Sequence, residues 1–216
     1  MDKILVVDLC NTLYKSNTTQ DFFSYIFKTD EKYKSIKRKN SNIGFKVINK
    51  LSNKILKYDM SRALITQMLK GKTSIEIENL VSNFIDEFLE QKKIEKVHRL
   101  ISDYKNQGYK IIIMSASYGF IVKEIVERLK FDGYISSEAE VINKIFTGKV
   151  SCDILYTKFK IFEKKYLSYE DLVMITDNET DYDFAMQTKK SYIVINNHNK
   201  KFWEKKKEEK FILMEE

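Results

Sequence analysis

The chain has 216 residues, of which 43% are apolar, so it is long enough for one sizeable core and is not a disordered chain. No apolar run approaches the roughly 20 residues that cross a bilayer, and the chain starts directly with a predicted strand, so we expect neither a membrane span nor a signal peptide. The formal net charge is +7, but lysines occur throughout the sequence and are mixed with glutamates, so the charge predicts no nucleic-acid partner.

Four short apolar runs rich in β-branched residues predict buried parallel strands. Helical patterns separate these runs, which indicates an α/β fold with crossover helices. The helix before the second strand shows apolar residues at helical spacing from Ile94 to Tyr104 and ends near Gly108. The predicted strands are, in chain order, Lys3–Val7, Lys110–Met114, Leu172–Ile175 and Ser191–Ile195.

Residues 14–92, between the first two strands, show helical patterns and no convincing strand. Aromatic and aliphatic side chains recur at helical spacing in three clusters, and Thr73 and Ser74 are predicted caps of the last one. The sequence therefore predicts a separate all-helical domain at 14–92, while residues 1–13 and 93–216 form the α/β core. The three clusters lie at Phe22–Phe27, Ala63–Leu69 and Ile75–Leu89.

The first predicted strand ends in Asp8, and the loop that follows contains Cys10 and Thr12. Open α/β sheets bind ligands at the carboxyl ends of their strands, so Asp8 occupies a position suited to function. A carboxylate there can act as a nucleophile toward phosphorus. A helix cap or an ion-pair partner is the alternative role for such an aspartate. Thr12 offers a hydroxyl group in the same loop.

The second predicted strand leads into Ser115, Ala116 and Ser117. Small residues at a strand end let hydroxyl and backbone N–H groups approach an anion, and the start of a following helix would favour it further. Lys158 lies in a helical stretch and can supply positive charge to the same site. Lys160 is the competing choice, but Phe162 lies four residues after Lys158, on the same helix face.

The third predicted strand is followed by Asp177 and Asp181, with Glu179 between them. Carboxylates packed beside Asp8 would repel one another unless a cation lay between them. Mg²⁺ prefers oxygen ligands and neutralises phosphate charge. The segment therefore predicts a magnesium site at this edge of the sheet.

In order and spacing, these segments resemble the four motifs of the haloacid dehalogenase (HAD) superfamily, and in particular its phosphoserine-phosphatase-like branch. In that branch a helical cap follows the first motif, and the second motif often reads Ser-Ala-Ser, as residues 115–117 do. The resemblance covers nearly the whole chain. It implies a Rossmann-like parallel-sheet HAD core with an inserted all-helical cap.

The resemblance also implies a role for each residue of the site. Asp8 would be the catalytic nucleophile, and Lys158 would stabilise the intermediate. Asp177 would bind Mg²⁺ together with Asp8 and the backbone carbonyl of Cys10, and Asp181 would be a direct ligand or a partner of the ligands. Phosphate-binding and substrate-binding roles would fall to Thr12, Ser115, Ala116 and Arg62, the one arginine of the cap expected to hold a substrate anion.

Cys10 departs from the pattern of the family. Phosphatases of the family usually carry an aspartate there, which protonates the leaving oxygen and later deprotonates the attacking water. A thiol with a reference pKa of about 8.5 fills both roles poorly near neutral pH. General acid–base catalysis contributes about 10²–10⁴-fold in rate, so we expect slower hydrolysis of that order.

We therefore expect a Mg²⁺-dependent phosphohydrolase that forms an aspartyl-phosphate and acts on a small phosphorylated metabolite. A phosphotransferase, a dehalogenase of the same fold, or a weakened binding or regulatory protein are the alternatives. Cys10 and Cys152 make no disulfide framework, which favours the cytoplasm. We expect a monomer or homodimer with no nucleic-acid or membrane partner. Positions after the first motif that are candidates for substrate choice are Asn17, Thr18, Thr19 and Asp21.

Overall fold

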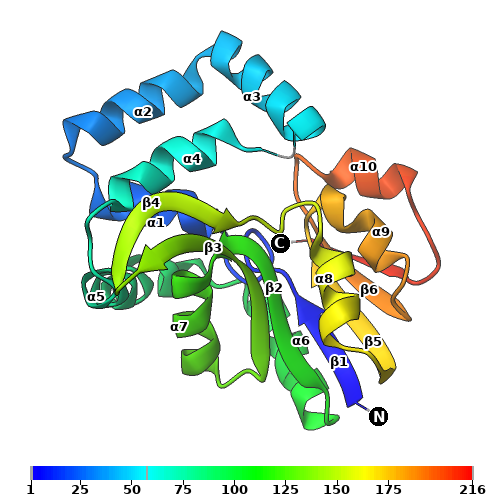
Figure 1. The fold of residues 1–216 in the computed structure, drawn as a ribbon. Helices are drawn as coiled ribbons and strands as arrows, with labels where there is room; N and C mark the ends of the chain where they lie inside the picture. Colours follow the sequence, from blue (N-terminus) through cyan, green and yellow to red (C-terminus); the bar gives the residue numbers. More distant parts are fainter. Residues whose placement is uncertain (1, 57, 216) are drawn as a thin grey trace.

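Seven strands form one mixed sheet in the computed structural model, which describes residues 2–56 and 58–215. The strand order across the sheet is β4-β3-β2-β1-β5-β6-β7, and only the β3–β4 pair is antiparallel (Figure 1). The strands are β1 (Asp2–Val7), β2 (Lys110–Tyr118), β3 (Gly133–Ile142), β4 (Ile145–Cys152), β5 (Tyr169–Thr176), β6 (Lys190–Ile195) and β7 (Phe211–Glu215).

Strand β1 lies at the centre of the sheet, between β2 and β5. Its residues from Ile4 to Val7 are fully buried, as expected for a parallel strand that is covered on both faces. Val7 is in register with Ile113 of β2 and Ile175 of β5. The residues that follow these three positions therefore emerge together at one edge of the sheet, and Asp8 is the first of them.

Alternate residues of the central strands enter two separate hydrophobic cores. Leu5 and Val7 pack in the core that includes α6 and α7, whereas Ile4 and Val6 pack in the core that includes α8, α9 and α10. The sheet is thus sandwiched between two helical layers, which confirms the predicted α/β class with a parallel-sheet core. These helices are α6 (Glu95–Asn106), α7 (Gly119–Leu129), α8 (Lys158–Lys165), α9 (Tyr182–Ala185) and α10 (Lys200–Lys205).

Helices fill the chain between β1 and β2, as predicted. Several of them begin at a polar residue whose side chain accepts a backbone N–H three residues on, and Thr73 does so for α5, as expected. In the described part of 14–92, strand pairing is limited to single bridges. The helices are α1 (Thr18–Ile26), α2 (Glu31–Ser41), α3 (Ile43–Leu56), α4 (Met60–Thr66) and α5 (Ser74–Phe84), and a π-helical turn, Ile85–Leu89, follows α5.

The antiparallel hairpin of β3 and β4 joins the helical insert to the core. The Gly71 N–H donates to the Phe146 carbonyl at 2.9 Å, and the Phe146 N–H donates to the Lys72 carbonyl at 2.9 Å. Gly148 has φ +82°, and a Cβ atom there would lie 3.2 Å from the Gln67 Cα, so only glycine fits this approach. The insert therefore packs on a strand pair that the sequence did not predict.

The strand predictions differ from the structure in two further ways. The predicted strand at Lys110–Met114 continues to Tyr118, so Ser115 lies inside β2 and α7 starts only at Gly119. A helix does follow this strand, as expected, but it begins four residues after Ser115. Strand β7 was also missed. Over the described residues, no helix is both long enough and apolar enough to cross a membrane.

Candidate active site

Asp8 lies at the carboxyl end of β1, and its carboxylate is almost completely buried. Its backbone N–H donates to the Ile175 carbonyl at 2.9 Å, which continues the β1–β5 pairing, and its Oδ1 accepts the Leu9 N–H at 2.9 Å. Lys158 Nζ lies 3.2 Å from the same Oδ1. Burial raises the pKa of Asp8 to about 6, while the charge of Lys158 opposes the rise.

Lys158 reaches the site from the first turn of α8, and only 4% of its side chain is exposed. Its Nζ lies 2.8 Å from Asp181 Oδ2, which also accepts the Thr176 hydroxyl at 2.8 Å. Burial alone would lower the pKa of Lys158, but the charges of Asp181 and Asp8 raise it above its ordinary value. Lys160 is exposed, so Lys158 is the lysine that the fold brings to Asp8.

Asp177 follows β5 and is hydrogen-bonded to Thr12 in the loop after β1. The Asp177 N–H donates to Thr12 Oγ1 at 2.9 Å, and the Thr12 hydroxyl donates to Asp177 Oδ1 at 3.2 Å. The Asp177 carbonyl accepts from Asn199 Nδ2 at 2.7 Å and Trp203 Nε1 at 3.2 Å. Burial and then the charge of Asp8 raise the pKa of Asp177 to about 7. Thr12 thus holds Asp177 in place and does not line the pocket.

The acidic residues of this edge divide into two kinds. Asp181 accepts hydrogen bonds from Lys158 and Thr176 and does not line the pocket, whereas Asp8 lines the pocket and its charge raises the pKa of Asp177. Two such carboxylates suit Mg²⁺, which takes few protein carboxylates and keeps several waters. Among the described residues, no group of three or more His, Cys, Asp or Glu side chains is arranged to hold a metal.

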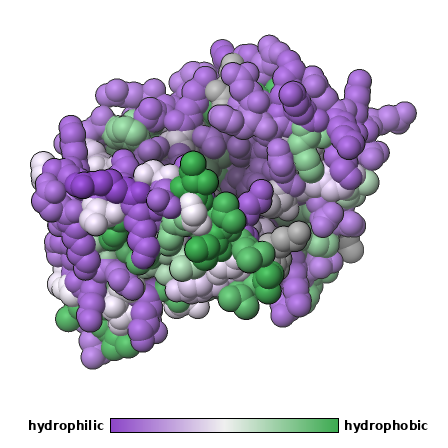
Figure 2. Space-filling model, turned by 90° about the horizontal axis from the view of Figure 1, so that it is seen from above, coloured by the Kyte–Doolittle hydropathy of each residue, from purple (hydrophilic) through white to green (hydrophobic). Residues whose placement is uncertain are grey.

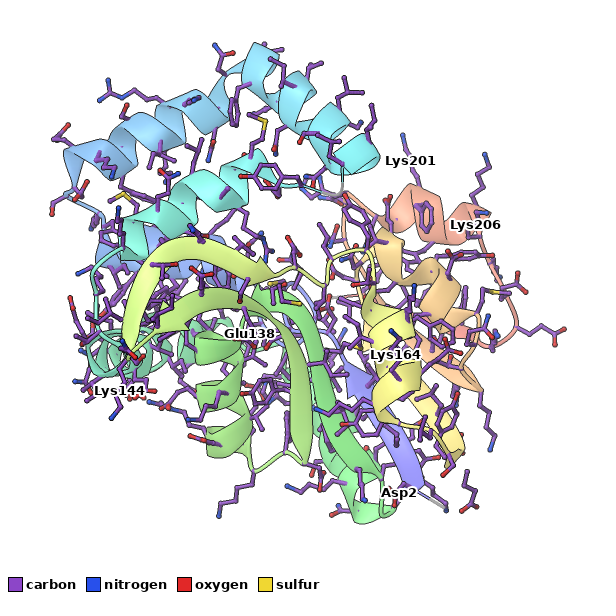
Figure 3. All side chains as sticks on the ribbon, in the orientation of Figure 1. Asp2, Glu138, Lys144, Lys164, Lys201 and Lys206 are labelled. Atoms are coloured by element: carbon purple, nitrogen blue, oxygen red, sulfur yellow. The ribbon has the colours of Figure 1, made fainter. Side chains whose placement is uncertain are left out.

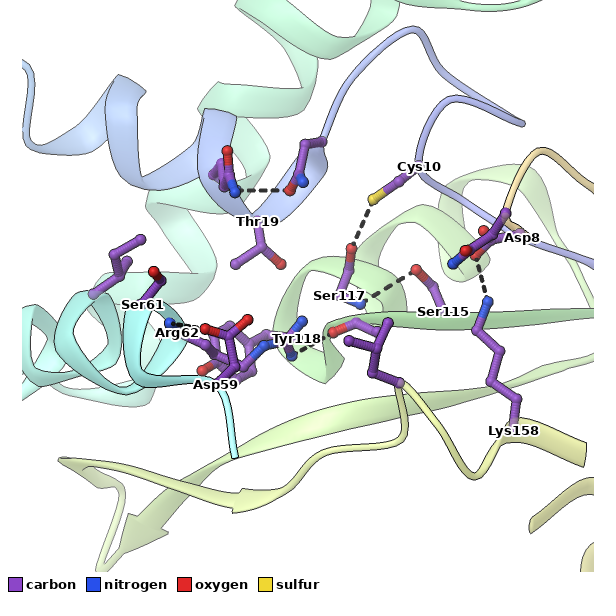
Figure 4. A pocket seen from close by; sticks show the side chains of 16 residues that line it. Asp8, Cys10, Thr19, Asp59, Ser61, Arg62, Ser115, Ser117, Tyr118 and Lys158 are labelled. Carbon is purple, nitrogen blue, oxygen red and sulfur yellow. Dashed lines mark hydrogen bonds and ion pairs between the residues drawn. The ribbon is translucent and has the colours of Figure 1, made fainter. Parts of the chain in front are cut away.

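A pocket of about 220 Å³ opens above these residues, between the sheet edge and the helical insert (Figure 4). Asp8, Lys158 and Ser115 line its inner end, and Arg62 and Asp59 line its outer end. Its walls thus come from both parts of the chain. The remaining lining residues are Cys10, Asn17, Thr19, Gln20, Ser61, Ile65, Ala116, Ser117, Tyr118, Leu155 and Asn178.

Cys10 takes part in a cluster with two hydroxyl groups. Its Sγ lies 3.2 Å from Ser117 Oγ and 3.4 Å from Thr18 Oγ1, and the two hydroxyl oxygens are 2.6 Å apart. Burial and then the charge of Asp8 raise the pKa of the Cys10 thiol, so the thiol is protonated at neutral pH. The Ser117 N–H donates to Ser115 Oγ at 3.2 Å, which connects the cluster to the pocket floor.

Arg62 lines the pocket from α4, but other groups of the protein already contact its guanidinium. One nitrogen donates to the Ala116 carbonyl at 2.6 Å, and Nε lies 3.4 Å from Asp153 Oδ2. Its Cζ is 5.4 Å from the centre of the Tyr118 ring, within cation–π range. Ala116 contributes its carbonyl to Arg62. Asp153, which follows β4, and Tyr118, at the end of β2, were not predicted, because only the folded chain brings them beside α4.

The positions proposed for substrate choice have different surroundings. Asn17 and Thr19 line the pocket, Thr18 contacts Cys10, and Asp21 accepts the Ser16 hydroxyl at 2.6 Å outside the pocket lining. Thr19 is buried, yet its Oγ1 has no hydrogen-bond partner among the described residues. A buried hydroxyl without a partner is costly, so this oxygen is suited to a ligand.

The fold and the site define a Rossmann-like α/β protein whose acidic residues and lysine gather at the carboxyl edge of the sheet, beneath a helical insert. A family model described as haloacid dehalogenase-like hydrolase matches residues 5–186, and the chain belongs to this family of hydrolases. The resemblance to the HAD superfamily is thereby confirmed.

Among the proteins that this chain is similar to are phosphoserine phosphatases. A phosphoserine phosphatase of Archaeoglobus fulgidus is 23% identical over 186 residues, which cover 83% of this chain and 48% of that protein, so the chain spans about half of its relative. A substrate-bound phosphoserine phosphatase structure is 20% identical with TM-score 0.63, over 93% of this chain and 90% of the other. A Bordetella pertussis protein of unknown function is 10% identical with TM-score 0.75, over 95% and 96% of the two chains.

Proposed function

We propose that this protein is a Mg²⁺-dependent phosphohydrolase that acts on a small phosphorylated metabolite through an aspartyl-phosphate on Asp8. The observation that carries the proposal is the placement of Asp8 at the inner end of a pocket, 3.2 Å from Lys158 and beside Asp177. The similarity to phosphoserine phosphatases supports the class of reaction.

The chain's own residues would act in two steps. In the first, an Asp8 carboxylate oxygen forms a bond to phosphorus while the bond from phosphorus to the leaving oxygen breaks. In the second, water attacks the phosphoryl group, releases phosphate and restores Asp8. Lys158 stabilises the negative charge of the transferring group, with Asp181 holding its ammonium in place. Ser115 Oγ, at the pocket floor, donates to a phosphate oxygen.

Asp8, Asp177 and the backbone carbonyl of Cys10 are the proposed ligands of Mg²⁺, which would neutralise negative charge of the carboxylates and of the phosphate. We assign Asp181 to Lys158 and not to the metal, since Lys158 and Thr176 both donate to it and, unlike Asp8, it does not line the pocket. Thr12 keeps Asp177 oriented and is not proposed to bind phosphate.

Cys10 sets the expected speed and the preferred leaving group. A protonated thiol with a raised pKa donates a proton poorly to an alkoxide and does not deprotonate water at neutral pH. We therefore propose that the enzyme favours substrates whose leaving group needs no proton, such as acyl phosphates. A phosphotransferase is the second candidate for the same reason. In that reaction an acceptor molecule, and not water, would take the phosphoryl group from Asp8, so Cys10 would not have to deprotonate water.

The helical segment 14–92 forms one wall of the pocket. We propose that residues 14–92 act as a cap that supplies the outer pocket wall, because Asn17, Thr19 and Arg62 all come from it. Arg62 would position the substrate by its fixed guanidinium and not by an unpaired charge. We propose a cytoplasmic enzyme, a monomer or a homodimer.

The proposal is tested by phosphate release from a panel of phosphate esters and acyl phosphates, with and without Mg²⁺. Wild type is compared with Asp8→Asn and with the control Asp183→Asn, whose side chain is exposed on α9. Release that requires Mg²⁺, is lost in Asp8→Asn and is retained in Asp183→Asn would support the proposal. Release that persists in Asp8→Asn would contradict it.

A further inference from the structure

Helix α3 carries an aliphatic stripe that is turned toward solvent. Ile43, Val47, Leu51 and Ile55 follow one another at intervals of four residues, so they share one face of the helix. Their exposed fractions are 80%, 63%, 56% and 66%. Ile48, also exposed, widens this stripe on one side. Amphipathic helices of globular proteins normally turn such a face to the core, so the stripe calls for a partner.

The opposite side of α3 holds the helix in this orientation. Phe45 is buried. The Asn49 side chain donates to Asp59 Oδ1 at 3.1 Å and accepts the Met60 N–H at 2.7 Å, which fastens α3 to the start of α4. The outward direction of the stripe is therefore fixed by specific contacts with the pocket-lining helix.

The basic charge of the chain is concentrated around this stripe. Residues 31–56, which span α2 and α3, contain eight Lys or Arg and one Glu, a net charge of +7 that equals the net charge of the whole chain. The net positive charge is therefore not evenly spread along the chain, contrary to the expectation from the sequence. In the described structure, Lys34 pairs with Glu31 at 2.6 Å, while exposed residues such as Lys46 and Lys50 have no acidic side chain within ion-pair distance.

Figure 2 looks down on this side of the molecule and shows a hydrophobic band with hydrophilic surface around it. An aliphatic face flanked by lysines matches a helix that lies in a membrane interface, where the apolar side chains enter about 5–10 Å and the cations meet lipid phosphates. We propose that α3 docks on an anionic membrane surface. The contact is peripheral and revises the expectation of no membrane partner.

Other occupants fit the surface less well. A second copy would bring another +7 segment against this one, and like charges repel at short range. A nucleic acid would match the charge but offers no apolar phase for Ile, Val and Leu side chains. Protein interfaces favour aromatic and arginine anchors, whereas the α3 stripe is purely aliphatic.

The test is co-sedimentation of the full chain with vesicles of 70% phosphatidylcholine and 30% phosphatidylglycerol, compared with phosphatidylcholine alone. We expect binding to the anionic vesicles and at least 10-fold weaker binding to the neutral ones. Each lysine near the surface contributes about fivefold, so Lys46→Gln combined with Lys50→Gln should weaken binding roughly 25-fold. Val47→Ser combined with Leu51→Ser should abolish it, and circular dichroism checks that both variants fold.

Matched controls come from exposed residues outside α3. Ile75→Ser with Leu167→Ser removes comparable apolar area, and Lys144→Gln with Lys164→Gln, whose positions are labelled in Figure 3, removes the same charge. Both controls should bind like wild type. Absent binding to anionic vesicles, or equal losses in the controls, would overturn the proposal. Dimerisation that depends on the α3 stripe, without vesicle binding, would assign the face to a second copy. Vesicle binding that is weakened by the lysine substitutions but not by the stripe substitutions would assign the face to a polyanion.

Discussion

Asp177→Asn should stabilise the metal-free protein and remove its response to Mg²⁺. Lys158 lies 3.2 Å from Asp8, whereas among the described residues no cation lies so close to Asp177. Burial and the charge of Asp8 raise the pKa of Asp177 from 3.8 to about 7. A shift of that size corresponds to about 4 kcal/mol, which the ionised group subtracts from the free energy of unfolding. The asparagine side chain keeps an oxygen that accepts from Thr12, but its NH₂ group would be left without a hydrogen-bond acceptor, which costs about 1–3 kcal/mol. The expected net gain is about 2 kcal/mol.

The sign of the pH dependence follows from the direction of the shift. A raised carboxyl pKa means that the folded state holds its proton more tightly than the unfolded state, so the cost of ionisation grows as pH rises from about 4 to about 7. The cost is fully present at pH 8. The gain from Asp177→Asn should therefore be larger at pH 8 than at pH 5.

Thermal unfolding of wild type, Asp177→Asn and Asp183→Asn at both pH values, with EDTA or with excess Mg²⁺, measures these effects. For a chain of this length a gain of about 2 kcal/mol raises Tm by roughly 4–8 °C. Mg²⁺ should raise the Tm of wild type and of the exposed control at pH 8, and should leave Asp177→Asn unchanged. A lower Tm for metal-free Asp177→Asn at pH 8, or an undiminished Mg²⁺ response, would refute the reasoning.

Three other substitutions probe the site. Cys10→Asp should raise turnover of esters with poor leaving groups by about 10²–10⁴-fold, with little change for acyl phosphates, in steady-state assays. Lys158→Gln should abolish turnover and lower the free energy of unfolding by about 3–5 kcal/mol in denaturant titrations, because Asp8 and Asp181 would lose their buried cation. Thr19→Val should stabilise the free protein by about 1 kcal/mol and raise KM, because the unpartnered hydroxyl would be replaced by a methyl group.

The sheet core could be predicted because its strands are buried on both faces. The run from Ile4 to Val7 is apolar without interruption and rich in β-branched residues, as expected for a parallel strand that is covered on both faces. The hairpin of β3 and β4 has mixed polar and apolar residues and was missed. Its turn residues Asn143 and Lys144 have φ +50° and +65°, as in a two-residue hairpin turn, and the alternation of Phe146, Gly148 and Val150 was the available signal.

The site could be predicted in part, for a similar reason. Asp8 and Asp177 follow parallel neighbouring strands, so their meeting at one edge follows from the topology alone. The pairing of Asp181 with Lys158 depends on the turn after β5 and on the first turn of α8, which no sequence pattern specifies. Arg62 was predicted to hold a substrate anion, and its contact with Asp153 arises only when the hairpin packs on α4.

The charge inventory of the site explains why metal and phosphate should bind together. Asp8, Asp177 and Asp181 bring three negative charges and Lys158 one positive charge into a buried region. A divalent cation would balance the net charge of −2, whereas a phosphate dianion that bound first would make the net charge more negative. Arg62 cannot make up the deficit, since Asp153 already lies 3.4 Å from its Nε. If the site binds Mg²⁺ as proposed, we expect phosphate to bind only after the carboxylates have been neutralised, so that Lys158 can stabilise the charge that the substrate adds.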